Sequence, residues 1–272
     1  MKILEVFTAS KTGNEKFNED AFFYNDDFVV VIDGVTAKSS VNTYPSEGRF
    51  AAEVIKKAFK YVDARYSPYK IISLLNLELE SASYISGYEF NPAVNLVVYN
   101  NKRKEIFTYG DCLFSVNGET FKYEKQIDKT LSEKRSQILK RAIEDGMSIE
   151  ELKENDISRK EIMDELISEL KFANRNTKKG YPMLNGTSVI KKFIHTQKVK
   201  EGDHIILASD GYPQLFKTLK ETEDYLFECL EKDPLCINEL YSTKGLGKGN
   251  ISFDDRTYIR FIIDDKEVSS WN

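Results

Sequence analysis

The stretch Phe28-Val-Val-Val-Ile-Asp-Gly34 decides the fold class of this 272-residue chain. Its continuous apolar run is typical of a strand that is buried on both faces. The run ends abruptly at Asp33-Gly34, so a carboxylate stands directly at the end of a buried strand. The same pattern returns in Leu207-Ala-Ser-Asp-Gly211. We therefore predict strands whose ends carry converging carboxylates.

Strand-like and helix-like segments alternate in blocks along the rest of the chain. Apolar patterning predicts strands over 2–9, 21–24, 28–33, 95–100, 105–109, 113–116, 186–196, 203–209 and 257–263. It predicts helices over 45–66, 68–86, 211–219, 221–232 and 235–242. Asn117-Gly118 predicts a tight hairpin turn. This order indicates an α+β fold in which helices cover sheets.

The composition changes between residues 128 and 180, which are rich in Lys, Glu, Asp and Ile. Three capping-box patterns occur there, namely Thr130…Glu133, Ser148…Glu151 and Ser158…Glu161. They predict charged helices over 131–144, 149–155 and 159–173. We interpret 128–180 as a helical insertion in a single domain that spans 1–272. Its many acidic side chains argue against a DNA-binding helix-turn-helix.

Composition limits the partners and the kind of metal site. The chain has 39 basic and 44 acidic residues and a net charge of −5, which argues against nucleic acid as a partner. It lacks an apolar run long enough for a membrane span, and its three cysteines are scattered, so we predict a cytoplasmic protein without a membrane partner. With only two histidines, any metal would be bound by oxygen, which favours Mg²⁺ or Mn²⁺.

Acidic residues occupy the ends or starts of several predicted strands. They are Asp33, Asp111, Asp210 and Asp254, with Glu19 and Asp20 before another strand. Each has an ordinary explanation when taken alone, because Asp-Gly is a common turn and Asp254-Asp255 resembles a solvated loop. Taken together, they indicate carboxylates that converge on cations, because strand ends hold ligands in fixed geometry.

The order of the motifs is what makes them specific. They run Asn18-Glu-Asp-Ala21, Val29-Val-Val-Ile-Asp-Gly34, Tyr109-Gly-Asp-Cys112, Leu207-Ala-Ser-Asp-Gly211 and Asp254-Asp-Arg-Thr257. In this order the chain resembles the metal-dependent protein phosphatases of type 2C, the PPM-type Ser/Thr phosphatases, and is most similar to bacterial members. The resemblance covers about residues 5–264. It implies a four-layer α-β-β-α sandwich of two antiparallel sheets, with 128–180 as a flap.

The resemblance also implies a role for each acid. Asp33 would bridge two metal ions, and Asp210 and Asp254 would complete the first. The Gly34 carbonyl and Glu19 would serve the second, with Asp20 beside them holding a water molecule. Asp111 and Asp210 would bind a weak third ion. A hydroxide held between two Mn²⁺ or Mg²⁺ ions would then attack phosphorus in line with the leaving alkoxide. The substrate would be a phosphoserine or phosphothreonine protein, with a Ser/Thr kinase as a candidate partner.

Four positions depart from the family pattern. Glu15 stands where an arginine often clamps the phosphate, so Lys16 or Lys11 would have to serve. Val35 replaces a histidine that is the proposed general acid in eukaryotic members, so water would protonate the leaving group. Gln214 replaces an acid, and Val35-Thr-Ala-Lys38 replaces a glycine pair.

Two alternatives stay open. The chain could be a catalytically weak or inactive phosphatase-like protein that binds or regulates a phosphoprotein, as Glu15 and Gln214 suggest. It could also be a haloacid-dehalogenase-type phosphatase, because Val30-Val-Ile-Asp-Gly34 resembles the nucleophile strand of that class. That chemistry needs a second acid two residues after Asp33, where Val35 stands.

Overall fold

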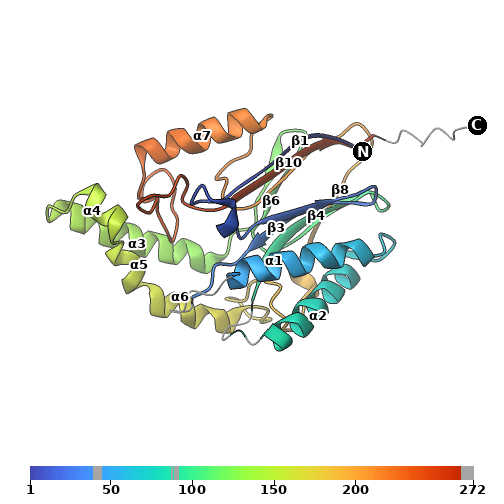
Figure 1. Cartoon of the computed structure of the whole chain (residues 1–272), viewed down its shortest axis with the longest axis horizontal. Coiled ribbons are helices and arrows are strands. Elements are labelled where there is room, and N and C mark those ends of the chain that lie inside the picture. The colour runs from blue at the N-terminus through green and yellow to red at the C-terminus, as the bar shows by residue number, and fades with distance from the viewer. Residues whose placement is uncertain (39–44, 87, 89–91, 265–272) are drawn as a thin grey trace, which may run out of the picture.

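Two antiparallel sheets form the centre of the molecule in the computed structural model (Figure 1). The structure describes residues 1–38, 45–86, 88 and 92–264. The first sheet has the order β1 (Lys2–Ala9), β10 (Arg256–Ile262), β9 (His204–Ala208), β6 (Leu113–Val116) and β7 (Glu119–Phe121). The second has the order β2 (Ala21–Tyr24), β3 (Phe28–Gly34), β4 (Val94–Asn100), β5 (Glu105–Tyr109) and β8 (His195–Lys198).

Strand β3 explains why its sequence is a continuous apolar run. Val29 and Val31 pack between the two sheets, against residues such as Ile259 of β10. Phe28, Val30 and Ile32 face the opposite way and pack against helices. Because successive side chains of a strand point to opposite faces, a strand in the middle of four layers must be apolar on both.

Helices cover the outer face of each sheet. Helices α1 (Glu47–Ala58) and α2 (Pro68–Ser86) pack on the second sheet, and α7 (Leu219–Lys232) packs on the first (Figure 1). In α7, Leu226 and Leu230 lie on one face and contact the cluster around Tyr258. The predicted four-layer α-β-β-α sandwich is therefore confirmed.

Four further helices extend from one end of the sheets. They are α3 (Gln126–Glu144), α4 (Ile149–Glu154), α5 (Ile157–Glu161) and α6 (Met163–Glu169), and we call residues 126–169 the helical arm (Figure 1). Arg135 of α3 is fully buried and fastens the arm. Its Nη1 donates to the carbonyls of Leu235 at 2.6 Å and Ser242 at 3.2 Å, while Nη2 pairs with Asp156 at 2.7 Å. Among the described residues, no helix is both long and apolar enough to cross a membrane.

In the helical arm, two of the three predicted capping boxes do not form. The box at Ser148…Glu151 forms and starts α4. Thr130 instead lies inside α3, which begins at Gln126, and its hydroxyl donates to the Gln126 carbonyl at 3.2 Å. Asp156, rather than Ser158, caps α5 by accepting the backbone N–H of Arg159 at 2.9 Å. The predicted helix over 159–173 is consequently divided into α5, α6 and a short 3-10 turn.

Other predicted boundaries were wrong. The helix predicted over 45–66 ends at Ala58, with one 3-10 turn up to Tyr61. The segment 211–218 forms turns, because Thr218 and Glu221 make a capping box that starts α7 at Leu219.

The segments 235–242 and 186–194 are irregular. Asp233 accepts the backbone N–H groups from Ile237 to Leu240, which therefore do not enter a helix ladder. The predicted strand over 186–196 forms only from His195, because Lys191–Phe193 makes a 3-10 turn before it.

Candidate metal centre

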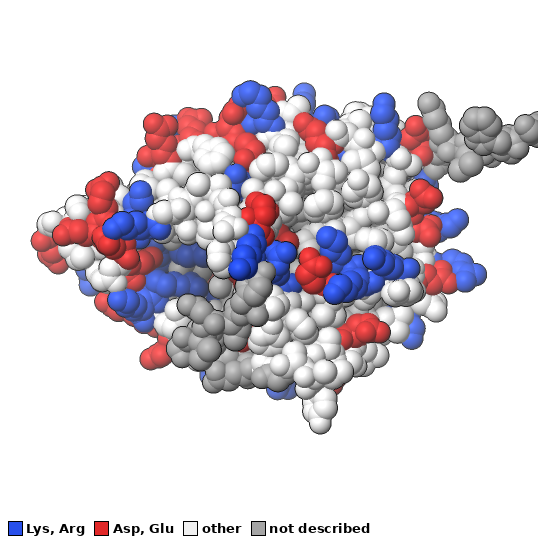
Figure 2. All heavy atoms as spheres, viewed as in Figure 1, with Lys and Arg blue, Asp and Glu red and all other residues white. Residues whose placement is uncertain are grey.

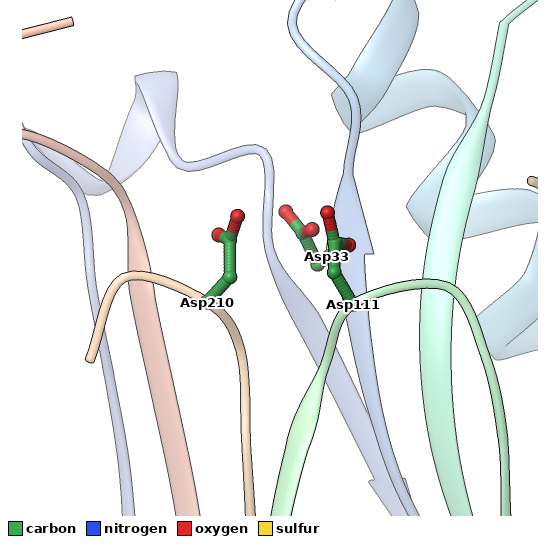
Figure 3. A group of neighbouring side chains, drawn as sticks. All are labelled: Asp33, Asp111 and Asp210. Carbon is green, nitrogen blue, oxygen red and sulfur yellow. The ribbon is translucent and has the colours of Figure 1, made fainter. Parts of the chain in front are cut away.

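Three carboxylates meet at the end of the sandwich from which the helical arm extends. Asp33 ends β3, Asp111 follows β5 and Asp210 follows β9, so both sheets contribute (Figure 3). Each offers one oxygen, and these three oxygens lie within 4.8 Å of one another. We call Asp33, Asp111 and Asp210 the carboxylate cluster. The prediction that acids at strand ends converge therefore holds for these three residues.

The cluster has few hydrogen-bond donors for its acids. Asn95 donates its Nδ2 to Asp33 Oδ2 at 3.1 Å. Lys125 Nζ lies 2.6 Å from Asp111 Oδ2, whereas Asp111 Oδ1 is buried and has no hydrogen-bond partner. Burial, followed by the charges of neighbouring acids, raises the pKa values of Asp33 and Asp210 well above their usual range. Converging carboxylates that repel one another and have few donors are stabilised by a cation. All-oxygen donors match a hard divalent ion such as Mg²⁺ or Mn²⁺, so the residues present fit such an ion.

Asp254 and Asp20 lie beside the cluster in different environments. Burial acts to raise the pKa of Asp254, but Lys244 and Lys11 hold it below its usual value. Asp254 pairs with both lysines, and the Lys11 Nζ–Oδ1 distance is 3.5 Å. Burial raises the pKa of Asp20 to about 8, although the Ser209 hydroxyl donates to its Oδ2 at 2.6 Å.

Glu19 and Gly34 form a tight junction next to the cluster. The Glu19 carboxylate accepts from the Ser46 hydroxyl at 2.6 Å and from the Thr36 hydroxyl. A Cβ at Gly34 would lie 2.3 Å from the Glu19 carbonyl oxygen and 2.5 Å from the Gly48 carbonyl oxygen, so only glycine fits there. Glu19 is thus held against the residue that follows Asp33.

The two lysines named from the sequence occupy different places. Lys11 reaches the acids, with its Nζ 3.3 Å from both Glu19 Oε2 and Asp255 Oδ2. Lys16 is exposed in the 3-10 turn Glu15–Phe17 and does not line the adjoining cavity. Glu15 fixes that loop, since it accepts the backbone N–H of Ser10 at 3.0 Å.

A large cavity opens in front of the cluster. Its volume is about 1110 Å³, and its walls come from the sheet ends, the helical arm and the loop 239–254. Cationic side chains gather around this hollow between the arm and the body (Figure 2). Four cationic residues that line the cavity were not predicted as site residues from the sequence, namely Lys38, Lys125, Arg159 and Lys244. Nothing in their local sequence marks them, because they meet only in the folded chain.

The two histidines stay away from the cavity. The His195 ring stacks on Tyr123 with 3.6 Å between ring centroids, and His204 is exposed at the start of β9. Neither lines the cavity. The site therefore offers oxygen and ammonium or guanidinium groups to a ligand.

Comparison with known proteins assigns the fold. By sequence, the chain matches no protein-family model and no curated protein. By structure, it matches the serine/threonine phosphatase PstP/Ppp of Mycobacterium tuberculosis with a TM-score of 0.52 at 13% identity, over 97% of this chain and 100% of that one. A structure of the PstP catalytic domain with two manganese ions matches over the same shares of both chains, with a TM-score of 0.51 and 13% identity.

The chain has the PPM-type phosphatase fold.

Within the PPM-type fold, the cluster occupies the junction of the two sheets. The acids come from β3 and from the ends of β5 and β9, so the sandwich itself sets their separation (Figure 3). The loop that carries Asp254 is fixed by its neighbour, because Asp255 accepts the backbone N–H groups of Lys11 at 2.7 Å and Glu19 at 3.0 Å. Asp255 is thus a positioning residue that ties together three segments of the site.

Proposed function

We propose that the chain is a metal-dependent phosphoserine/phosphothreonine protein phosphatase. The observation that carries the proposal is the meeting of Asp33, Asp111 and Asp210 within 4.8 Å at the mouth of a cavity. The PPM-type fold, which the chain shares with PstP, supports it. The manganese ions named in the PstP structure support Mn²⁺ or Mg²⁺ as the cofactor.

Each acid has a proposed ligand role. Asp33 would bridge two ions, Asp210 and Asp254 would complete the first, and Glu19 and the Gly34 carbonyl would serve the second. Asp20 would hold a water molecule, and Asp111 with Asp210 would take a weak third ion. When bound, such ions activate water and offset charge on the phosphoryl oxygens.

The chain's own side chains would bind and orient the substrate. Lys11 lines the cavity beside the acids and is our candidate for contacting the phosphoryl group, with Lys16 as a more distant one. Water attacks phosphorus, the bond from phosphorus to the seryl or threonyl oxygen breaks, and that oxygen takes a proton. Val35 lines the cavity and cannot donate a proton, so a second water molecule supplies it and regains a proton from the attacking water.

The remaining features are proposed with the activity. The chain would act as one domain over 1–272, with 128–180 as a flap over the site; residues 265–272 lie outside the described part. The substrate would be a cytoplasmic phosphoprotein, supplied by a Ser/Thr kinase.

A catalytically weak relative that only binds a phosphoprotein is the second candidate. It is favoured by two positions. The Glu15 carboxylate accepts from Ser10 and Asn18 instead of reaching the cavity, and Gln214 is exposed. Turnover separates the two candidates, whereas metal binding does not.

The first experiment measures hydrolysis of p-nitrophenyl phosphate and a phosphothreonine peptide with Mn²⁺, with Mg²⁺ and with chelator. The proposal predicts turnover of both substrates that is lost in chelator and restored by metal. The matched control is Asp224→Asn, which removes an exposed acid that pairs with Lys220 on α7 and should leave turnover unchanged. Folded protein without turnover under any metal would favour the binding protein.

A further inference from the structure

Several cations in the cavity are already matched by acids. Lys11 pairs with Glu19, Asp254 and Asp255, and Lys244 pairs with Asp254. Lys125 pairs with Asp111 at 2.6 Å. These lysines offset the charges of the acids in the site already described, so they do not indicate a further anion site.

Lys38 and Arg159 differ from these cations. Both line the cavity, Lys38 from the loop after β3 and Arg159 from α5 of the arm. In the described part of the chain, neither forms an ion pair with a carboxylate. Arg159 Nη1 donates to the Thr243 carbonyl at 2.8 Å, which aims the guanidinium without neutralising it. Burial lowers the pKa of Lys38 to about 7, with Arg159 and Lys244 adding to the effect.

The pair lies on the arm side of the cavity. The charges that act most strongly on Lys38 are those of Arg159, Lys244, Asp128 and Lys125, which all line this cavity. The pKa of Arg159 is lowered by burial and by the charge of Arg135, and the charges of Asp156, Asp128 and Asp254 act against this. Both cations act on Asp128, and neither is among the groups that act most strongly on Asp33 or Asp210.

We propose that Lys38 and Arg159 form a subsite for a second anionic group of the substrate, next to the phosphoryl group that is hydrolysed. The proposal rests on the proposed function and names the class of substrate: a phosphopeptide with a further negative charge near the phosphoresidue. Both cations line one cavity and the charge of Arg159 acts on Lys38, so they repel, and an anion bound near both removes that cost. Arg159 offers planar paired donors, which suit either a carboxylate or a phosphate.

The cavity has room for such a substrate. A volume of about 1110 Å³ exceeds what one phosphoryl group needs and matches a short peptide segment with its side chains. The second anion could be an acidic side chain or another phosphate. These share the chemistry recognised here, and the experiment separates them.

The test compares kcat/KM with Mn²⁺ for three peptides of one sequence that share a phosphothreonine. One has neutral flanking residues, one has two flanking glutamates, and one has a second phosphate. We expect the wild-type protein to prefer an anionic flank by about tenfold, the effect of one charge-assisted contact of about 1.4 kcal/mol. Lys38→Gln and Arg159→Gln should each bring the ratio close to one, and Lys38→Arg should preserve it. Lys160→Gln, on the same helix but bonded to Asn155, is the matched control and should preserve it too.

The three peptides give distinct answers. A preference for both anionic peptides identifies any anion as sufficient, and a preference for the second phosphate alone identifies phosphate. Equal kcat/KM values in the wild-type protein, or a preference that survives both glutamine variants, would overturn the subsite. Binding of phosphonate analogues of the three peptides, followed by fluorescence anisotropy with Mn²⁺, applies the same criteria without hydrolysis. An absence of turnover together with retained, variant-sensitive binding would therefore count against the proposed enzyme and for the subsite.

Discussion

The carboxylate cluster and the loop 233–242 use the same residue type in opposite ways. Asp233, at the end of α7, is buried and accepts the backbone N–H groups of Ile237, Asn238, Glu239 and Leu240 at 2.7–3.3 Å. Asp111, in the cluster, has an oxygen that is buried without any hydrogen-bond partner. Backbone donors therefore surround the acid that holds a loop, whereas the acids that converge from both sheets have only a few side-chain donors, such as Asn95 and Lys125.

This difference distinguishes an acid that stabilises the fold from an acid that is suited to bind a cation. A buried carboxylate surrounded by N–H groups lowers the free energy of the folded state. A buried carboxylate next to other carboxylates raises it until a cation binds. Asp111 and Asp233 are both buried, so burial alone does not distinguish these two acids.

The largest expected effect comes from Asp33→Asn. The amide keeps the shape and an oxygen for the contact with Asn95 but loses the charge that would bridge two ions. We expect turnover of p-nitrophenyl phosphate to fall by about 10³-fold, or roughly 4 kcal/mol of transition-state stabilisation, with the fold intact. Circular dichroism and kinetics at matched Mn²⁺ check this, with Asp224→Asn as control. Turnover at the wild-type rate would show that Asp33 is not a metal ligand. The proposed difference between Asp33 and Asp233 would then be wrong.

The next effect is on stability, from Asp233→Ala. Removing the carboxylate leaves buried N–H groups of the loop 237–240 without an acceptor. The free energy of unfolding should fall by about 3 kcal/mol. Urea denaturation measures it, and the exposed acid Asp224, changed to alanine, is the control. A midpoint equal to that of the wild-type protein would show that this acid does not hold the loop.

The smallest effect is a pH dependence carried by Asp20. Its pKa rises from 3.8 in the unfolded chain to about 8 in the folded protein, so the folded state holds the proton more tightly. Ionisation therefore penalises the folded state, and the penalty grows as the pH rises from about 4 to about 8. When the pH falls from 8 to 6, protonation of Asp20 should raise the free energy of unfolding of metal-free protein by about 2 kcal/mol.

Lys38 acts in the opposite sense near pH 7, because burial lowers its pKa to about 7. The contribution of Asp20 is therefore the difference between the wild-type protein and Asp20→Asn, measured by urea denaturation in chelator at both pH values. The gap between the two proteins should narrow on acidification. A gap that stays constant would mean that Asp20 ionises as it does in the unfolded chain.

The resemblance to the PPM-type phosphatases predicted the four-layer sandwich. The local patterns predicted an α+β fold and the meeting of Asp33, Asp111 and Asp210, because buried strands and the acids at their ends leave a local signal. Sequence-based prediction was wrong where contacts formed only in the folded chain overrode a local pattern. Thr130 has a capping pattern, but α3 starts one turn earlier and absorbs it. The helix expected over 235–242 lost its N–H groups to Asp233. Lys38 and Arg159 have no local signal, since they come together only when the arm packs over the sheet ends.

The buried guanidinium of Arg135 links the helical arm to the body of the protein. Arg135 binds the body through Leu235 and binds Asp156, the residue that caps the helix carrying Arg159. The acids of the cluster lie on the sheets, outside this linkage. Exchange of residues on α5 can therefore alter the proposed subsite while the carboxylate cluster stays unchanged. Replacing Arg135 would disturb the packing of the arm and the proposed subsite in one step, so we expect selection to act on it as strictly as on the acids.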